Sequence, residues 1–360
     1  MQSKDLYLLL ETLKNNANVA VVYSGDPKDP SNVLYQSHNT RSWKSYKAVA
    51  QDIVNALKNR GFKQVFLMEE GAGLWKSLLK KKIHFAWLNT GGVQGFDSMG
   101  HCPGMLQSLG VPYVGHSPLQ AALMDDKIAF KYFLNGAGIR TAPFTTWHPR
   151  DNTDALGAGG FHKRLVEILS WDNGKFIVKP ACGRASQHIY VANSTEEVLG
   201  LCRRVYSETG NRVMVEQFLP GKEYCVAVMG RPIHSDSSQQ KGWALRHQKP
   251  VCFAQFERVL DDPQGIFASM DTRPISESVV KVLDPAVHGN VIRELNLIAT
   301  GIYSKLGLYG LVRLDVRMDA AGRLHVLEAN PKPDLKAPEK GVTSLVAMGL
   351  KQLGMTYEEL

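Results

Sequence analysis

No run of apolar residues in this 360-residue chain is long enough to cross a bilayer as a helix, which takes about 20 residues. The longest apolar stretches, residues 8–10 and 19–23, are far shorter. Lys4, Asp5 and Glu11 lie around the N-terminal leucines, and such charges are not typical of a secretory signal. We therefore expect a cytoplasmic protein that does not bind a membrane.

Cysteine is scarce, and its pattern argues against two kinds of structure. The five cysteines are an odd number and include no C-x-x-C pair, and the 11 histidines include no H-E-x-x-H motif. A disulfide framework and a zinc centre are therefore unexpected, and a reducing compartment fits. The cysteines are Cys102, Cys182, Cys202, Cys225 and Cys252.

Several familiar motifs are missing as well. The chain has no G-x-x-x-x-G-K-[ST] loop, no G-x-S-x-G and no kinase H-R-D, and the Gly71-Ala-Gly73 segment lacks the third glycine of a dinucleotide fingerprint. Net charge is +8, yet the only tight basic run is residues 80–82, which is also typical of a solvated helix end. We expect no nucleic-acid partner, and the positive excess suits a polyphosphate ligand.

What is present is typical of a folded protein with two or three domains, at 44% hydrophobic and 21% charged residues. The first third alternates β-type segments (18–23, 65–68, 83–88 and 112–114) with a helical pattern at 43–60. Such β-α-β alternation predicts a parallel sheet covered by helices. The rest of the chain predicts mixed α+β structure, with helices at 117–135, 196–207 and 288–306 and a hairpin that ends at Asn330.

This hairpin carries the strongest chemical signal. Two runs of period-2 alternation surround a four-residue loop, and they predict two antiparallel strands. If Met318 pairs with Arg323, Arg313 lies opposite Glu328, and alternation groups four polar side chains on one face. Their carboxylate and amide oxygens suit Mg²⁺, and the guanidinium suits a developing oxyanion. An exposed hairpin with cross-strand ion pairs is the alternative. The four residues are Arg313, Asp315, Glu328 and Asn330.

Two weaker signals precede the hairpin. Lys179 ends an apolar strand just before Pro180 and a loop of small residues, a setting that suits phosphate binding but also an ordinary solvated lysine. Glu216 ends a later strand, and Glu223 follows the turn after it. Backbone groups around residues 217–219 can pair with adenine, and either acid can accept hydrogen bonds from the adenine amino group or the ribose.

In this order and spacing, the three segments resemble the ATP-grasp superfamily and, within it, the D-alanine–D-alanine ligase-like group. The resemblance implies an ATP-grasp fold with a pre-ATP-grasp domain at residues 1–117, a central subdomain at 118–232 and a C-terminal subdomain with the metal site at 233–360. It also implies an ADP-forming ligase that transfers the γ-phosphoryl group of ATP to a substrate oxygen before an amine attacks.

The resemblance assigns a role to each matching residue. Asp315, Glu328 and Asn330 are expected to bind two Mg²⁺ ions, with Arg313 stabilising the tetrahedral intermediate. The expected ATP contacts are Lys127 and Lys179 at the phosphates, Glu216, Gln217, Phe218 and Leu219 at adenine, and Glu223 at the ribose.

The sequence departs from the family where the family recognises its substrate. The acidic residue expected after the first strand is replaced by the stretch 24–29, and a histidine-glycine pair by Asn89-Thr-Gly-Gly. The small-residue loop after Asn330 becomes Pro331-Lys-Pro-Asp-Leu-Lys336. An intact ATP site beside an altered substrate site favours a different substrate.

Among relatives with such changes, the chain looks most like cyanobacterial ligases that condense mycosporine-glycine with serine or threonine. Arg41, Trp43, Lys44 and Ser344 are then candidate substrate contacts, although the first three are also typical of an ordinary helix start. The alternatives are a D-alanine–D-alanine ligase of peptidoglycan synthesis and a non-catalytic ATP-binding regulatory protein. We also expect the polar loop 234–249 to close over the phosphates through Lys241 or Lys249, and the family suggests a homodimer.

Overall fold

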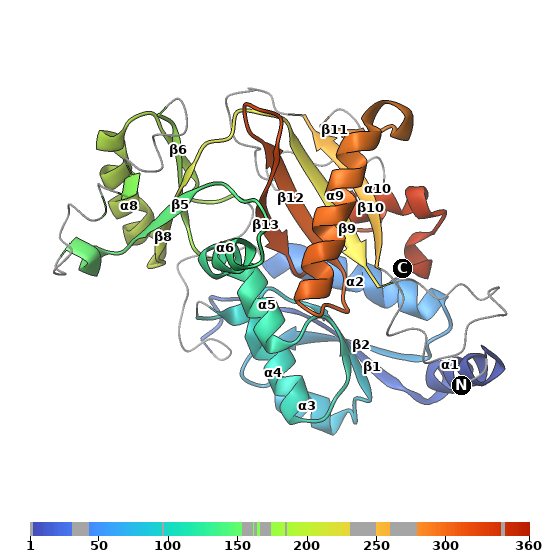
Figure 1. Cartoon of the computed structure of the whole chain (residues 1–360). Helices are drawn as coiled ribbons and strands as arrows, with labels where there is room; N and C mark the ends of the chain where they lie inside the picture. Colours follow the sequence, from blue (N-terminus) through green and yellow to red (C-terminus); the bar gives the residue numbers. More distant parts are fainter. Residues whose placement is uncertain are drawn as a thin grey trace.

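The computed structural model describes residues 3–30, 43–95, 97–152, 161, 164–165, 174–183, 186–230, 250–259, 279–339 and 343–360. Three sheets with their helices make up this part of the chain, in the mixed α/β arrangement that the sequence predicts (Figure 1). None of its helices combines the length and the apolar character needed to cross a membrane.

The first sheet is parallel, as the alternation in the first third predicts, and its strands run in the order β2-β1-β3-β4. Its elements and helices are α1 (Ser3–Asn16), β1 (Asn18–Ser24), α2 (Trp43–Asn59), β2 (Gln64–Glu70), α3 (Leu74–Lys80), β3 (Phe85–Asn89), a 3-10 turn (Ser98–Gly100), α4 (His101–Ser108) and β4 (Tyr113–Val114). Helices α3 and α4 pack on one face of β1 and α2 packs on the other. This two-sided burial explains why β1 is almost wholly apolar.

The single helix predicted at residues 117–135 is wrong, because the chain forms two helices there, α5 (Pro118–Asp125) and α6 (Lys127–Gly136). Asp126 between them is extended, with ψ of 106°, and its carboxylate accepts hydrogen bonds from the backbone N–H of Ile128 and Ala129. This N-cap satisfies donors that a continuous helix would bond internally, so a new helix begins. Lys127 becomes its first residue.

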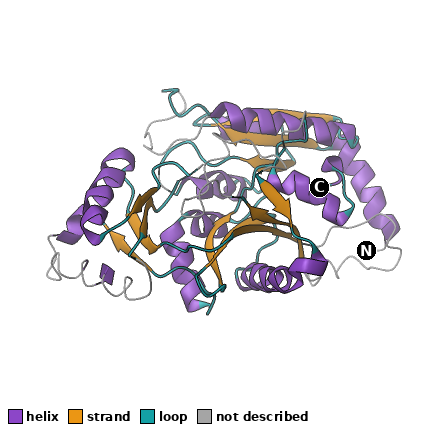
Figure 2. Cartoon of the chain, turned by 90° about the horizontal axis from the view of Figure 1, so that it is seen from above, coloured by secondary structure: helices purple, strands orange, loops and turns teal. Residues whose placement is uncertain are grey.

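The second sheet is antiparallel, with the order β5-β8-β6-β7. Its elements are β5 (Phe144–Trp147), a 3-10 turn (Pro149–Asn152), β6 (Phe176–Pro180), β7 (Tyr190–Ala192), α8 (Thr195–Thr209) and β8 (Val213–Gln217). Strand β5 lies where the sequence predicts the start of a connector. Helix α8 and this sheet share a core of their own, and Figure 2 shows them at one end of the molecule.

The third sheet is also antiparallel, with the order β11-β10-β9-β12-β13. Its elements are β9 (Glu223–Met229), β10 (Val251–Arg258), β11 (Val280–Val282), α9 (Pro285–Lys305), β12 (Val312–Met318) and β13 (Leu324–Asn330). Helices α5, α6 and α9 pack on one face of the sheet. On its other face, α2 joins α10 (Leu345–Gly349), and 3-10 turns (Leu350–Leu353 and Tyr357–Glu359) end the chain. The first and third sheets thus share one core.

The proposed domain boundaries after residues 117 and 232 stay a prediction. Strand β9, which the sequence places in the central segment, hydrogen-bonds to β10 and β12 in the third sheet. A division that follows the sheets therefore separates β8 from β9 at the turn near Gly221.

Candidate active site

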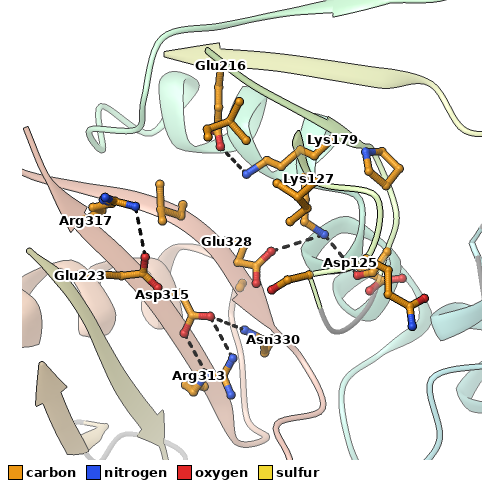
Figure 3. A pocket seen from close by; sticks show the side chains of 18 of the residues that line it. Asp125, Lys127, Lys179, Glu216, Glu223, Arg313, Asp315, Arg317, Glu328 and Asn330 are labelled. Carbon is orange, nitrogen blue, oxygen red and sulfur yellow. Dashed lines mark hydrogen bonds and ion pairs between the residues drawn. The ribbon is translucent and has the colours of Figure 1, made fainter. Parts of the chain in front are cut away.

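One cavity collects all eleven residues that are expected to hold ATP and metal or to act in catalysis. They come from α6, from β6 and β8 of the second sheet with the segment that follows β8, and from β9, β12 and β13 of the third sheet (Figure 3). The residues are Lys127, Lys179, Glu216, Gln217, Phe218, Leu219, Glu223, Arg313, Asp315, Glu328 and Asn330. Their contacts to a ligand stay predictions.

The hairpin of β12 and β13 differs in register from the prediction. Arg313 faces Asn330, Asp315 faces Glu328, and Met318 pairs with Leu324 instead of Arg323. One residue of shift arises at the turn, and a bulge between Asp315 and Val316 adds a second. The predicted pairing is wrong, but at Arg313 and Asp315 the total shift is two residues, so these side chains still share a face with Glu328 and Asn330 and the polar group still forms.

Asp315 lies at the centre of this group and is buried. Its Oδ1 accepts from Nε of Arg313 at 2.9 Å, and its Oδ2 accepts from Nη2 of Arg313 at 2.9 Å and from Nη1 of Arg258 at 3.2 Å. The amide of Asn330 lies 3.4 Å from Oδ2. Burial alone raises the pKa of Asp315, but the two guanidinium groups outweigh it and hold this pKa below its usual value. Asp315 is therefore an ionised carboxylate.

Two arginines that the sequence analysis missed surround Glu223. Arg258 bridges Glu223, at 2.9 Å, and Asp315, and Arg317 lies 3.6 Å from the other oxygen of Glu223. Burial nevertheless raises the pKa of Glu223. Arg317 continues the period-2 series of Arg313 and Asp315, which was a usable signal. Arg258 ends β10, a strand that was not predicted.

Lys127 connects α6 to the hairpin. Its Nζ lies 3.4 Å from the carboxylate of Glu328 and donates to the carbonyl oxygen of Gly183 at 3.3 Å (Figure 3). The expected phosphate lysine and the expected bridging metal ligand are thus neighbours. The ammonium of Lys127 can bind a phosphate oxygen, and the carboxylate of Glu328 beside it can bind a metal ion.

Lys179 and Glu216 form a buried ion pair through Oε1 of the glutamate. A second lysine, Lys131 of α6, places its Nζ 2.7 Å from Oε2 of Glu216. Burial opposes the charge on Glu216, yet the two ammonium groups lower its pKa to about 2. Lys131 is fully buried, and this burial lowers its pKa to about 8. The sequence analysis did not identify Lys131. In this arrangement Glu216 holds Lys179 at the edge of the cavity.

The segment after Glu216 forms the expected adenine end. The N–H of Gln217 donates to the carbonyl of Pro143 and that of Phe218 to Lys175, so an adenine contact falls on their carbonyl groups or on Leu219. The guanidinium of Arg317 lies 4.8 Å from the centre of the Phe218 ring. This stacking links the adenine end to the acids of the hairpin.

The comparisons with known proteins agree with this geometry. The family model "D-ala D-ala ligase C-terminus" matches residues 133–360, which include most of the cavity lining. The chain belongs to the D-alanine–D-alanine ligase family. The D-alanine–D-alanine ligase of Desulfotalea psychrophila is 30% identical over 279 residues, 77% of this chain and 76% of that protein. The enzyme of Pseudoalteromonas translucida is 24% identical over 312 residues, 86% of this chain and 88% of its own.

Solved structures of similar proteins show the same fold. The D-alanine–D-alanine ligase of Bacillus anthracis, complexed with ATP, has a TM-score of 0.65 at 18% identity, covering 96% of this chain and 94% of that one. The D-Ala:D-Ser ligase of Enterococcus faecalis has a TM-score of 0.64 at 17% identity, covering 96% and 97%. The chain is thus an ATP-grasp, ADP-forming ligase of the D-alanine–D-alanine ligase type.

Two segments in which the sequence analysis identified departures from the family pattern meet helix α2 at one end of the cavity. Lys332, in the loop after β13, donates to Oδ1 of Asn89 at 3.2 Å, and its ammonium lies 4.4 Å from the centre of the Tyr46 ring. Asn89 ends β3, and its amide donates to the backbone carbonyl of Tyr46 in α2 at 2.8 Å. Tyr46 and Lys332 line the cavity. The two segments and α2 therefore lie in contact with one another.

Of the other expected substrate and lid residues, Ser344 alone has a side chain that the structure describes. Ser344 is fully buried, and its hydroxyl caps α10 by accepting from the N–H of Ala347 and donates to the carbonyl of Lys336. Trp43 and Lys44 lie in the first turn of α2, where side chains are outside the described residues. Arg41 and the loop 234–249, with Lys241 and Lys249, also lie outside them.

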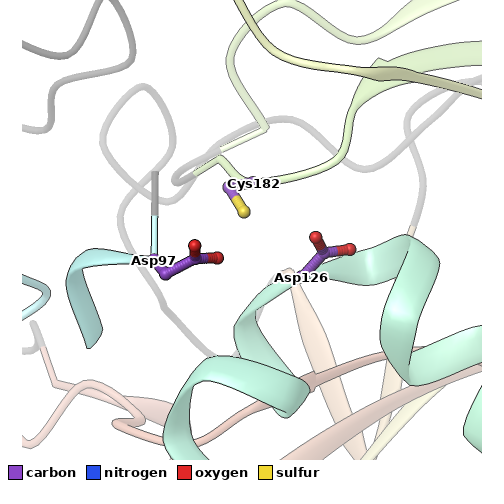
Figure 4. Close-up of side chains that lie close together, drawn as sticks. All are labelled: Asp97, Asp126 and Cys182. Atoms are coloured by element: carbon purple, nitrogen blue, oxygen red, sulfur yellow. The ribbon is translucent and has the colours of Figure 1, made fainter. Parts of the chain in front are cut away.

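A second group of potential ligands lies beside the cavity. Asp97, Asp126 and Cys182 bring two carboxylates and a thiol within 4.8 Å of one another (Figure 4). One carboxylate oxygen of Asp126 already accepts two backbone hydrogen bonds as the cap of α6. Asp126 therefore has a structural role as a helix cap, and we assign the group no metal.

Proposed function

We propose that this ligase condenses mycosporine-glycine with serine, threonine or a similar amino acid to form an imine-linked mycosporine-like amino acid. The observation that carries the proposal is the contact between Tyr46, Asn89 and Lys332. Asn89 and Lys332 belong to segments that the sequence analysis identified as departures from the family pattern, and Tyr46 lies in the same helix as the candidate substrate contacts Trp43 and Lys44. The cavity contains all the residues expected to bind ATP and metal, and they lie beside a substrate region whose sequence departs from the family pattern. This combination supports the same activation chemistry on a different acceptor.

The residues expected to bind ATP and metal fit ATP and Mg²⁺. We propose that Lys127 and Lys179 bind the phosphates, and that Asp315, Glu328 and Asn330 supply oxygen ligands to two ions. Asp315 and Glu328 face each other across the hairpin, and hard cations prefer carboxylate and amide oxygens. Bound Mg²⁺ supplies neutralisation of the charge on the transferred phosphoryl group.

In the proposed reaction the γ-phosphoryl group passes to the ring carbonyl oxygen of the acceptor in its enol form. The amine of the amino acid then adds to that ring carbon, inorganic phosphate leaves with the oxygen, and the nitrogen loses its protons to give the imine. Arg313 stabilises the negative charge that develops at the reacting centre. The bidentate contact with Asp315 fixes the orientation of its guanidinium.

D-alanine–D-alanine ligation is the second candidate, and the comparisons favour it over the first. The curated relatives named above are D-alanine–D-alanine ligases. The third possibility, a non-catalytic ATP-binding regulatory protein, is set aside because the chain belongs to a family of ligases.

The test is ADP release by the purified protein with Mg-ATP and two sets of substrates. One set is D-alanine alone, and the other is mycosporine-glycine with serine, threonine or another amino acid. We expect turnover only in the second set, with an imine product identified by mass and ultraviolet absorbance. Turnover with D-alanine alone would overturn the proposal in favour of the second candidate.

A further inference from the structure

The first sheet carries a cluster of three buried polar side chains near the substrate end of the cavity. Ser24 ends β1, Glu70 ends β2, and Thr90 directly follows β3. All three therefore lie at the carboxyl edge of parallel strands. The strand order β2-β1-β3 changes direction at β1, and open parallel sheets bind their ligands at the carboxyl edge beside such a change. The cluster thus lies where a functional role is expected.

Hydrogen bonds run through this cluster in one direction. The N–H of Gly91 donates to the Ser24 hydroxyl at 2.8 Å. The N–H of Gly92 donates to the Thr90 hydroxyl at 2.9 Å. The two hydroxyl oxygens are 2.9 Å apart, and the Thr90 hydroxyl donates to the carboxylate of Glu70. Because each hydroxyl has one proton, Ser24 donates to Thr90, and Glu70 is the final acceptor of the chain.

Asn89 connects this cluster to the cavity wall. It precedes Thr90, so its side chain lies on the opposite face of the strand end. There it contacts Tyr46 and Lys332, and both of these residues line the cavity. A displacement of Thr90 would therefore also displace the contacts between Asn89 and the wall.

The two glycines after Thr90 contact a second part of the wall. The carbonyl of Gly91 accepts from the Ser98 hydroxyl at 2.9 Å, and Met99, the next residue, lines the cavity. Gly92 has a φ of 80°, and a Cβ atom at this position would overlap the side chain of Ser98. The loop is thus packed tightly in a conformation that suits glycine.

The surroundings of Glu70 are apolar apart from this cluster. Its side chain lies on the face of the sheet that α3 and α4 cover, and among the described residues no cation contacts it. Cys102 of α4 is the titratable side chain on that face, and burial together with Glu70 raises the pKa of its thiol well above the usual value, so it stays neutral. Glu69 lies on the other face and accepts from the Tyr23 hydroxyl. The remaining charged or titratable side chains of α3 and α4 are exposed: Lys76, Lys80 and His101.

The charge of Glu70 does not stabilise the fold. Burial raises the pKa of Glu70 to about 7, although the hydrogen bond from Thr90 opposes this rise. Because the folded protein disfavours the charged form, the contribution of Glu70 to stability falls as pH rises from 4.5 toward 7. A buried acid that costs stability is typical of a functional role.

We propose that Glu70 is a positioning residue for the acceptor substrate. Its carboxylate holds Thr90 by a charge-assisted hydrogen bond, and Thr90 holds the loop 89–92 that supports the cavity wall. Protonation of Glu70 replaces this bond with a weaker one between neutral groups, so the loop is held less firmly. The inference rests on the proposed function for the identity of the acceptor substrate. Glu70 does not line the cavity, and it acts through Thr90.

The experiment measures KM for the acceptor substrate and for ATP at pH 6 and pH 8 with the wild type and Glu70→Gln. We expect the acceptor KM of the wild type to be about fivefold higher at pH 6, where Glu70 is protonated. Glu70→Gln should show the higher KM at both pH values, so the ratio of the two proteins falls from about five at pH 8 toward one at pH 6. KM for ATP should differ between the two proteins by less than about twofold. Glu196→Gln, on the exposed side of α8, is the matched control and should follow the wild type.

The hydroxyl of Thr90 gives an independent test. Thr90→Val removes this hydroxyl and should raise the acceptor KM at pH 8, whereas Thr90→Ser retains it and should restore the wild-type value. If Thr90→Val has a normal acceptor KM, or if the ratio of Glu70→Gln to the wild type is the same at both pH values, the inference is wrong. The wild-type profile and the two Thr90 variants leave Glu70 unchanged, so they decide the question even if Glu70→Gln folds poorly.

Failure of the proposed function gives a different result. If the wild type turns over only D-alanine, the identity of the acceptor substrate is wrong. The same measurements of KM, made with D-alanine, then test Glu70, because the loop 89–92 supports the wall of the same cavity.

Discussion

Two buried acids of the cavity, Asp315 and Glu216, are charged because cations lie against them. Asp315 is buried yet ionised through Arg313 and Arg258, and Glu216 through Lys131 and Lys179. A buried carboxylate without such partners would take up a proton. Removal of either charge therefore has two separable effects, one on the reaction and one on stability.

At the hairpin we expect Asp315→Asn to reduce metal-dependent turnover by about 100-fold or more, because an expected ligand and the partner of Arg313 are lost together. The measurement is ADP release as a function of Mg²⁺ concentration. Glu196→Gln, which makes the same chemical change on the exposed side of α8, is the control. Near-normal turnover in Asp315→Asn would rule out the ligand role.

The lowered pKa of Glu216 predicts that the stability of the protein depends on pH. Its pKa is about 2 in the folded protein against an ordinary value of 4.5, so its contribution is full above pH 4.5 and is lost as pH falls toward 2. The pKa of Lys131 is also lowered, to about 8 from an ordinary 10.5, so it makes stability fall as pH drops from 10.5 to 8, which is above the range of interest for Glu216. We base the prediction on Glu216 because two ammonium groups contact it.

The test is the free energy of unfolding in urea between pH 7 and pH 3 for the wild type and Glu216→Gln. We expect the variant to be less stable at pH 7 and the difference between the two proteins to shrink toward pH 3. A constant difference across this range contradicts the assignment of the low pKa.

At the scale of elements, the break between α5 and α6 determines where Lys127, an expected phosphate ligand, lies. Lys127 starts α6 only because Asp126 caps that helix, and its backbone N–H donates to the carbonyl of Ala181 at 2.9 Å. The cap thus joins α6 to the loop after β6. The bulge in the hairpin acts in a similar way, since it brings Asp315 opposite Glu328.

We expect Asp126→Ala to lower stability by about 1 kcal/mol, the usual cost of a lost N-cap. Because the first turn of α6 then frays, KM for ATP should also rise. Asp126→Ser retains a capping side chain and should restore both properties. Urea unfolding and ATP-dependent kinetics give the two readouts, and an unchanged KM in Asp126→Ala argues that Lys127 does not depend on the cap.

At the scale of the whole molecule, the second sheet stands apart from the other two. The first and third sheets share a core through α2 and α10, whereas β5 to β8 and α8 pack in a core of their own. The expected ligands come from both sides of this division, with Lys179 and Glu216 for ATP on one side and Asp315 and Glu328 for the metal ions on the other. We therefore expect bound Mg-ATP to bridge the two bodies.

We expect Mg-ATP to slow amide hydrogen exchange in residues 213–223 and 312–330 and to leave β1 and β2 unchanged. Ligand contacts stabilise the segments that they bridge, while the first sheet gains no contact. Hydrogen exchange measured by mass spectrometry with and without Mg-ATP tests this. Protection confined to the third sheet would mean that the second sheet does not help to hold the nucleotide.

Local sequence patterns determined much of this protein. Period-2 alternation grouped Arg313, Asp315, Glu328 and Asn330 correctly, because it sorts side chains by parity within each strand and the actual pairing differs from the predicted one by an even number of residues. The parallel first sheet and helix α2 likewise follow from patterns within short windows. What only the tertiary structure decided involves distant segments. Arg258 reaches Asp315 across 57 residues, and Lys332 reaches Asn89 across 243. Such contacts depend on how the sheets pack and where a bulge falls, and no local periodicity records either.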